Sequence, residues 1–402
     1  MKNYILEYFL KYVKINTMSS EDSTETPSTK CQYDLANVLV NDLKELGLKN
    51  VKLLDHCFVV GELESNSNSN LTIGFIAHMD TIPGFSGKDV KPNVINNYDG
   101  NTIKLKNIEL NPNEFTFLNN LKGKTLITTD GTTVLGADDK AGIANIMGML
   151  KYFSLNKDIP HVNIKVAFTP DEEIGGGIGL FDVKGFNADF AYTVDGELYD
   201  EINYENFNAA SANITINGLD IHPGNAKGHM INSSLVAMEF NSLLNPFERP
   251  EYTELYDGFN HLVYINGEVG KTNMTYILRN HNKELLEKQK DEFINARDFL
   301  NKKYGNNTVI VDIKDSYYNM RDIIDKDMRS VNTAIKAMKK LGITPKVTPI
   351  RGGTDGARLT QMGLLTPNIG TGGYNPHGPY ELACLEEMEI VSKILIEIAK
   401  ND

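Results

Sequence analysis

The chain contains the stretch Leu71-Thr-Ile-Gly-Phe-Ile-Ala-His-Met-Asp80, an apolar run that ends in two polar side chains one residue apart. A short apolar run of this length predicts a buried strand. Because side chains alternate along a strand, His78 and Asp80 should point to the same side. The strand therefore indicates a sheet whose edge carries polar groups side by side.

Further apolar runs follow the same pattern and alternate with helical periodicity. The predicted strands are 58–60, 71–77, 164–168, 190–194 and 346–350, and the predicted helices are 4–13, 143–153, 328–338 and 386–399. Strands that are apolar throughout and alternate with helices are typical of a parallel sheet covered on both faces. We predict an α/β fold, with a mostly parallel sheet and helices on both faces. The polar repeat 65–70 is expected to be a loop.

The pattern changes between about residues 208 and 313. The expected elements there are strand 211–216, helix 233–244, strands 262–268 and 274–278, helix 283–303 and strand 308–313. This β-α-β-β-α-β order is that of ferredoxin-like domains. A chain of 402 residues is also too long for one ordinary core. We therefore predict a larger domain made of 1–207 and 314–402, into which an α+β domain of 208–313 is inserted.

Composition excludes several classes of function. The chain has 41% hydrophobic and 23% charged residues, as globular proteins do, and its 40 basic and 53 acidic residues give a net charge of −13. That charge disfavours binding to nucleic acid or an anionic membrane. The first apolar stretch is interrupted by Glu7 and Lys11, so neither a membrane span nor a signal peptide is expected. Three scattered cysteines, Cys31, Cys57 and Cys384, favour a reducing cytoplasm.

Acidic residues gather where predicted strands and helices meet. Asp138 and Asp139 stand at the start of a helix, where one of them is explained as an N-cap and the other has no assigned task. Asp171, Glu172 and Glu173 follow a strand and precede glycines. Three adjacent carboxylates indicate either a solvated turn or a site neutralised by cations.

Two further polar residues extend the pattern. Asp195 ends the strand 190–194, and His377 lies in a glycine-flanked loop near the C-terminus, although each could be an ordinary turn residue. His78 could bind zinc while Asp80 holds its other nitrogen, or the pair could be a hydrogen-bonded strand end. Ligand sites in open α/β sheets form at the carboxyl ends of the strands, where these residues recur.

The motifs together resemble a known family. They are His78-x-Asp80, Gly136-Ala-Asp-Asp-Lys-Ala-Gly142, Ala167-Phe-Thr-Pro-Asp-Glu-Glu173, Tyr192-Thr-Val-Asp-Gly196 and Gly372-Gly-Tyr-Asn-Pro-His-Gly378. In this order they resemble the peptidase T family of aminotripeptidases, within the dinuclear zinc aminoacylases and carboxypeptidases. Two segments that hold no metal motif, 205–211 and 351–356, are also similar to peptidase T and favour that family over the wider group.

The resemblance implies roles for single residues. It implies two zinc ions per subunit, with cobalt or manganese as substitutes. The expected ligands are His78 and Asp195 for one ion, Glu173 and His377 for the other, and Asp138 as a bridge between them. Three ligand carboxylates would balance most of the charge of two divalent ions.

The implied reaction is release of the N-terminal residue from short peptides, chiefly tripeptides. Asp80 would orient His78, and Glu172 would be the general base that moves a proton from water to the leaving nitrogen. His222, in the inserted domain, resembles a histidine that stabilises an oxyanion, although it could be an ordinary turn residue. Arg279 and Arg351 are candidates for binding the substrate carboxylate, with a surface ion pair as the alternative for Arg279.

Other interpretations stay open. A deacylase or carboxypeptidase would use nearly the same ligands, and a peptide-binding or metal-binding protein could keep the scaffold without the reaction. Glu172 argues against the second, because metal storage needs no general base. The inserted domain is expected to form a homodimer in which His222 completes the partner's site, since its edge strands could pair across a two-fold axis.

Overall fold

The structure is a computed structural model that describes residues 1–400. The chain divides into two compact units. The first comprises Met1–Tyr204, Asp322–Thr348 and the residues from Thr354 onward, and the second comprises Glu205–Arg321 with Pro349–Gly353. The second unit therefore starts earlier and ends later than the predicted range of 208–313. It also takes in Arg351, which the sequence assigned to the larger domain.

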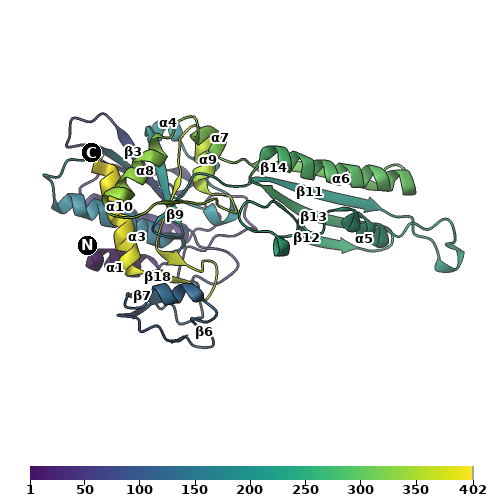
Figure 1. Ribbon diagram of the computed structural model, residues 1–402, viewed down its shortest axis with the longest axis horizontal. Coiled ribbons are helices and arrows are strands. Elements are labelled where there is room, and N and C mark those ends of the chain that lie inside the picture. Colours follow the sequence, from purple (N-terminus) through teal and green to yellow (C-terminus); the bar gives the residue numbers. More distant parts are fainter. Residues whose placement is uncertain (401–402) are drawn as a thin grey trace. The chain divides into compact units, whose positions relative to one another are not determined.

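An eight-stranded sheet forms the centre of the first unit (Figure 1). Its order is β1 (Lys49–Leu53), β2 (Val59–Leu63), β8 (Asn163–Thr169), β3 (Thr72–His78), β9 (Phe190–Gly196), β16 (Asn368–Gly370), β10 (Glu201–Asn203) and β15 (Lys346–Val347). The neighbours β8/β3, β3/β9, β9/β16 and β10/β15 are parallel, and the other three pairs are antiparallel. The predicted parallel sheet thus holds for the centre, and antiparallel pairs lie toward its edges.

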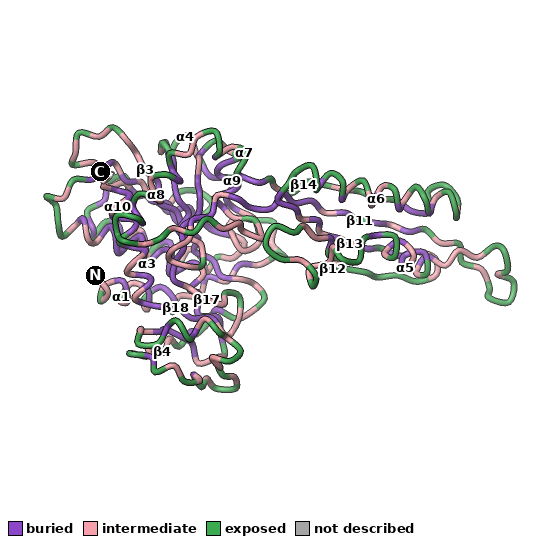
Figure 2. The backbone as a smooth tube through the Cα atoms, in the orientation of Figure 1, coloured by how far each residue is buried: buried purple, intermediate pink, exposed green. Residues whose placement is uncertain are grey.

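Helices cover both faces of this sheet, as predicted. Ala191 of β9 packs with residues of α4 (Val183–Phe186) and α9 (Asp355–Gln361). The next side chain, Tyr192, points to the opposite face, where its hydroxyl donates to the carbonyl oxygen of Ser330 in α8 (Arg329–Lys340). Because both faces are covered, β3 is buried along almost its whole length (Figure 2).

Helix α3 (Ala137–Leu155) connects the core to the site. It packs against β3 and β9, and against α1 (Lys2–Tyr12) and α10 (Leu385–Lys400), in a cluster that includes Ile5, Ala144 and Met388. Helix α2 (Gln32–Glu45) lies beside β1. Gly142 brings α3 close to β9, because a Cβ atom there would stand 1.9 Å from the carbonyl oxygen of Val194.

A smaller sheet holds the loop that carries His377. Its order is β17 (Gly373–Tyr374), β18 (Leu382–Cys384), β7 (Leu126–Thr128) and β4 (Asn93–Ile95). Beside it are the pair β5 (Ile103–Lys104) and β6 (Glu109–Leu110) and the short helix η2 (Thr116–Asn120). Phe117 stacks on Tyr374 at 4.8 Å between ring centroids, and Phe115 packs on Tyr380 at 5.1 Å. Aromatic contacts therefore brace both ends of the His377 loop.

The second unit is an antiparallel sheet with two helices. The strand order is β12 (Phe259–Gly267), β13 (Lys271–Asn280), β11 (Asn208–Asn217) and β14 (Val309–Tyr317). Helices α5 (Ser233–Leu243) and α6 (Lys283–Tyr304) pack on it through a core that includes Phe240, Tyr276 and Phe293. This is the predicted ferredoxin-like arrangement.

One predicted element is wrong in its extent. The strand predicted over 346–350 stops at Val347, and Ile350 instead bridges Asn206 in the second unit. Pro349 explains the break, because proline has no N–H group to donate to a strand ladder. Among the described helices, none combines the length and the apolar character needed to cross a bilayer.

Candidate metal centre

The predicted motifs meet at one edge of the central sheet. His78 ends β3, Asp195 lies at the end of β9, and Glu172 and Glu173 follow β8. These three strands are parallel neighbours, so their carboxyl ends lie together. Helix α3 adds Asp138 from its first turn.

The Asp138 carboxylate lies between two imidazoles. Its Oδ1 atom is 2.8 Å from Nε2 of His78, and its Oδ2 atom is 3.1 Å from Nε2 of His377. Each oxygen thus faces a different histidine. This is the geometry of a carboxylate that can bridge two cations.

Each histidine also contacts a second carboxylate. Nε2 of His78 is 3.5 Å from Oδ1 of Asp195, and Nε2 of His377 is 2.9 Å from Oε2 of Glu173. The structure therefore brings together all five residues for which the family resemblance implies a ligand role. They form two groups, and Asp138 is shared by both.

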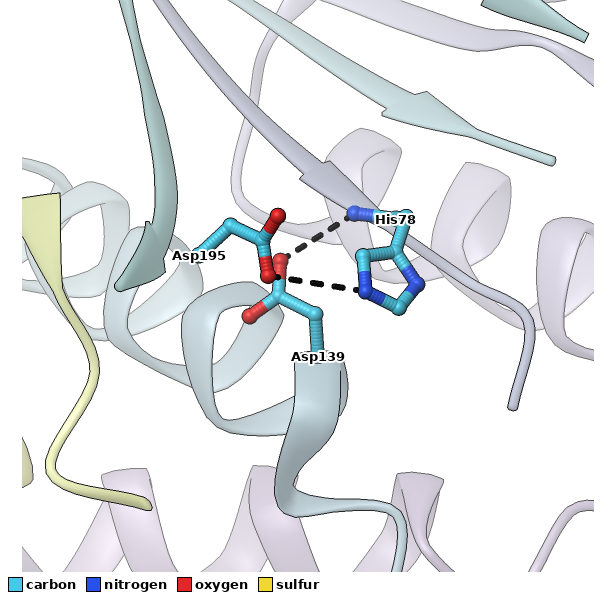
Figure 3. Close-up of side chains that lie close together, drawn as sticks. All are labelled: His78, Asp139 and Asp195. Carbon is cyan, nitrogen blue, oxygen red and sulfur yellow. Dashed lines mark hydrogen bonds and ion pairs between the residues drawn. The ribbon is translucent and has the colours of Figure 1, made fainter. Parts of the chain in front are cut away.

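Asp139 is a further buried carboxylate in the same place (Figure 3). Its Oδ2 atom accepts the backbone N–H of His78 at 3.1 Å, and its Oδ1 atom accepts the N–H of Gly142 at 3.2 Å. It could also share an ion with His78 and Asp195, since one ligand atom of each lies within 4.8 Å of the others. Its two N–H partners indicate that Asp139 caps α3 and joins it to β3.

Asp80 is fully buried and has two sets of contacts. Its Oδ1 atom is 3.4 Å from Nδ1 of His78, and that nitrogen also lies 3.1 Å from the Asp80 backbone oxygen. Its carboxylate accepts the backbone N–H groups of Glu172 at 3.0 Å and Glu173 at 3.2 Å. Asp80 therefore positions both His78 and the loop that carries the two glutamates.

The electrostatics of the site suit cations. Burial is the largest single influence on the pKa of His78 and lowers it, but the charge of Asp195 and hydrogen bonds to Asp138, Asp195 and Asp80 together raise it well above its usual range. Hydrogen bonds to Asp138 and then to Glu173 raise the pKa of His377 to about 10. Burial raises the pKa of Asp195 to about 6 although His78 opposes it. Protons on the histidines thus balance the carboxylates in the metal-free protein, and cations could replace those protons.

The side chain of Glu172 takes part in none of the ion pairs given above for His78 and His377. Burial, followed by the charge of Asp195, raises the pKa of its carboxyl group well above its usual range. A raised pKa suits a carboxylate that accepts a proton and then releases it near neutral pH. The donor set of two imidazoles and three carboxylates with a further carboxylate beside them fits divalent cations such as zinc.

The comparisons with known proteins agree with this site. A family model described as Peptidase family M20/M25/M40 matches residues 134–401. This chain belongs to that peptidase family. Proteins named peptidase T are 52% identical over 404 residues in Alkaliphilus oremlandii, covering 99% of this chain and 98% of the relative, and 49% identical over 405 residues in Bacillus subtilis, covering 100% and 99%. These full-length relatives confirm the resemblance to peptidase T.

Solved structures share the fold of this M20/M25/M40 peptidase. The aminopeptidase PepT of Bacillus cereus aligns with a TM-score of 0.80 at 21% identity, covering 100% of this chain and 98% of that chain. A dinuclear metal binding peptidase of family M20 from Bacillus subtilis aligns with a TM-score of 0.66 at 14% identity, covering 99% and 97%. At these identities the alignments support the fold.

The three basic residues singled out in the sequence lie in the second unit of this family member. His222 is exposed and precedes a short 3-10 helix, where its Nδ1 atom accepts the N–H of Gly224 at 3.2 Å. The Arg279 guanidinium donates to the carbonyl oxygen of Leu278 at 2.9 Å and lies 5.4 Å from the ring of Tyr317. Its second hydrogen-bond acceptor is also a backbone carbonyl oxygen, that of Ala210 at 3.3 Å.

The side chain of Arg351 contacts other residues of the second unit. Its Nη1 atom donates to the carbonyl oxygens of Leu255 at 2.7 Å and Asp257 at 2.9 Å, and its guanidinium lies 5.1 Å from the ring of Phe207. A substrate carboxylate at Arg351 would therefore share the guanidinium with backbone carbonyls or replace them.

Sequence reasoning missed two buried carboxylates near the centre of this peptidase. Asp355 begins α9 and accepts the hydroxyl of Thr169 at 2.8 Å, and burial raises its pKa to about 8. Glu381 accepts backbone N–H groups from the segment that leads to Asp138. Neither lies within a ligand motif. Asp355 lies within the segment 351–356, whose similarity to peptidase T was the one signal in the sequence that pointed to it.

Proposed function

We propose that this chain is a tripeptide aminopeptidase that uses two zinc ions per subunit, with cobalt or manganese as substitutes. Membership of family M20/M25/M40 and full-length similarity to proteins named peptidase T support the activity. The observation that carries the metal centre is the placement of Asp138 between His78 and His377, one carboxylate oxygen to each imidazole.

The residues of the first unit would bind and orient the reacting groups. His78 and Asp195 would hold one cation, Glu173 and His377 the other, and Asp138 both. The cations would polarise the peptide carbonyl and lower the pKa of a water molecule. Asp80 would keep His78 in one tautomer, because its carboxylate faces the second ring nitrogen.

Glu172 would be the general base and then the general acid. It would take a proton from water and deliver it to the leaving nitrogen, which needs protonation because an amide is a poor leaving group. The same loop carries Glu173, so both backbone N–H bonds to Asp80 fix the base relative to the metal ligands.

The second unit would recognise the rest of the substrate. Arg279 and Arg351 would bind the carboxylate end of a short peptide, and His222 would stabilise the oxyanion. The cations would contact the amino end of the peptide and the guanidinium groups its carboxyl end. Contacts at both ends would limit the length of peptide that binds. Selection for tripeptides in particular is carried over from the resemblance to peptidase T.

A homodimer through the second unit, placed in the cytoplasm, completes the proposal. Strand β12 is an edge strand and exposes Val263, Tyr264 and Ile265, each about half exposed at 48%, 51% and 51%. Helix α5 exposes Leu235 and Met238. Exposed apolar side chains beside an unpaired strand edge favour association with a second copy.

Hydrolysis of Ala-Ala-Ala tests the activity. Metal-loaded protein should release one alanine and Ala-Ala, chelation should abolish the reaction, and zinc or cobalt should restore it. N-acetyl-Ala-Ala-Ala is the control that separates the alternatives, because acetylation blocks an aminopeptidase and suits a deacylase. Full activity in protein shown by elemental analysis to be free of metal would refute the metal centre.

A further inference from the structure

Glu381 is a buried carboxylate outside every predicted motif. It is 2% exposed and lies four residues after His377, at the end of the loop that joins β17 to β18. The same loop carries His377. Interactions that fix the position of Glu381 therefore also affect the position of His377.

Three backbone N–H groups converge on this carboxylate. The N–H groups of Leu135 and Gly136 donate to Oε2 at 2.7 and 2.8 Å, and the N–H of Asp138 donates to Oε1 at 3.0 Å. These donors lie at the start of α3, where no preceding helical turn supplies carbonyl acceptors. Hydrogen bonds from N–H groups to a charged acceptor are among the stronger ones in proteins.

The local sequence allows the carboxylate to approach. Gly136 has φ of 75°, a left-handed conformation that glycine adopts without strain, and this turns successive N–H groups toward one point. The buried side chain of Lys140 interacts electrostatically with Glu381 and donates to the carbonyl oxygen of Ile15 at 2.8 Å. The buried carboxyl group of Glu381 thus has three N–H donors and the side chain of Lys140 close by.

We propose that Glu381 is a positioning residue that locks the Asp138 segment to the His377 loop and so sets the distance between the shared carboxylate and the second histidine. This rests on the proposed metal centre. The backbone N–H of Asp138 is itself bound by Glu381, and the side chain of Asp138 contacts His377 at 3.1 Å. The two segments therefore meet twice, once through Glu381 and once through the ligand pair.

The matched control is Glu386, in α10. Its Oε2 atom accepts the backbone N–H of Thr125 at 2.7 Å and its Oε1 atom lies 3.1 Å from Nζ of Lys2, so it also joins distant segments through a carboxylate. It contacts no proposed ligand. Loss of stability alone should therefore affect Glu386→Gln and Glu381→Gln alike, whereas loss of site geometry should affect only the second.

Two measurements on Glu381→Gln, Glu381→Ala and Glu386→Gln test the proposal. In metal-free protein, hydrogen exchange by mass spectrometry should show the segment 135–138 exchanging at least ~10-fold faster in the Glu381 variants only. Zinc titration should show the weaker of the two ions bound about 10-fold to 100-fold less tightly in Glu381→Ala. Glu381→Gln should fall between, because its amide oxygen can still accept two of the three N–H groups. If the alanine variant does not fold, the glutamine variant decides by the same measurements.

Two outcomes of these measurements would overturn the proposed role of Glu381. Faster exchange with unchanged zinc affinity would show that Glu381 only caps α3, and unchanged exchange with unchanged affinity would refute the contacts as well; either overturns the proposal. A wild-type protein that binds no zinc would instead refute the proposed metal centre, and the exchange result would still report on the Glu381 contacts.

Discussion

Adjacent carboxylates in this protein have different partners. Asp138 faces two imidazoles, whereas Asp139 accepts N–H groups from β3 and α3. Glu173 contacts His377, whereas in the described part of the chain Glu172 is in none of the ion pairs of the two histidines. Neighbouring residues of one type can therefore separate ligand binding from structural support or proton transfer, because successive side chains leave the backbone in different directions.

The pair Glu172 and Glu173 yields a prediction about single side chains. Glu172→Gln should lower kcat by a factor of at least ~100 while two cations stay bound, because the amide cannot take a proton from water. Glu173→Gln should lose a cation, because it removes the carboxylate that faces His377. Kinetics and elemental analysis of the same preparations check both. Loss of a cation from Glu172→Gln would mean that the two roles are exchanged.

At the level of elements, the site depends on how closely α3 approaches β9. A Cβ atom at Gly142 would stand 1.9 Å from the backbone oxygen of Val194 and 2.3 Å from Oδ1 of Asp139. Neither the β9 backbone nor the capping carboxylate can yield easily. The separation of α3 from β9 in turn sets that of Asp138 from Asp195.

Gly142→Ala should therefore destabilise the protein by about 1–3 kcal/mol, as overpacking does, and should also weaken cation binding. Gly148→Ala is the matched control in the same helix, because its Cβ would crowd the buried side chains of Ile5 and Ser392 and none of the ligand carboxylates. Thermal unfolding and zinc titration measure the two effects. Equal zinc affinity in both variants would show that the approach of α3 to β9 does not control the site.

For the whole molecule, the buried ionisable groups predict how stability changes with pH. Burial raises the pKa of Asp195, Glu381 and Asp355 to about 6, 7 and 8, and hydrogen bonds raise that of His377 to about 10. The folded metal-free protein thus holds more protons than the unfolded chain above about pH 4, so its stability should fall as pH rises. The His377 contribution is complete below its usual pKa of 6.5 and is lost as pH rises through about 10.

The melting temperature of metal-free protein should therefore fall from pH 5 to pH 8, above which the lowered pKa of Lys140, about 8, contributes with the opposite sign. Asp138 has the opposite sign, because its pKa is lowered from 3.8, but its contribution is complete above that pH and constant across this range. Zinc should stabilise the protein more at pH 8 than at pH 6, since fewer protons compete for the ligands once Asp195 has lost its proton. Calorimetry with and without zinc would contradict this if metal-free stability rose between pH 5 and pH 8.

The proposed dimer predicts complementation between inactive variants. His222→Ala and Glu172→Ala should each be nearly inactive if His222 acts in the partner's site. Random co-assembly after unfolding and refolding makes half the dimers mixed, each with one whole site, so about a quarter of wild-type activity should return. Activity assays with mass spectrometry of the dimers measure this. Mixed dimers without recovered activity would place His222 within its own subunit or outside the reaction.

The sequence by itself determined the polar strand ends, the ferredoxin-like order of the second unit and the family. These follow from local patterns, because apolar runs predict buried strands and each motif is a few residues long. Only the tertiary structure decided which carboxylates face the histidines, that Glu381 meets the Asp138 segment 243 residues away, and that Arg351 packs with the second unit. Such contacts join segments that are distant in the chain, and their partners depend on strand order and helix packing, which periodicity does not encode.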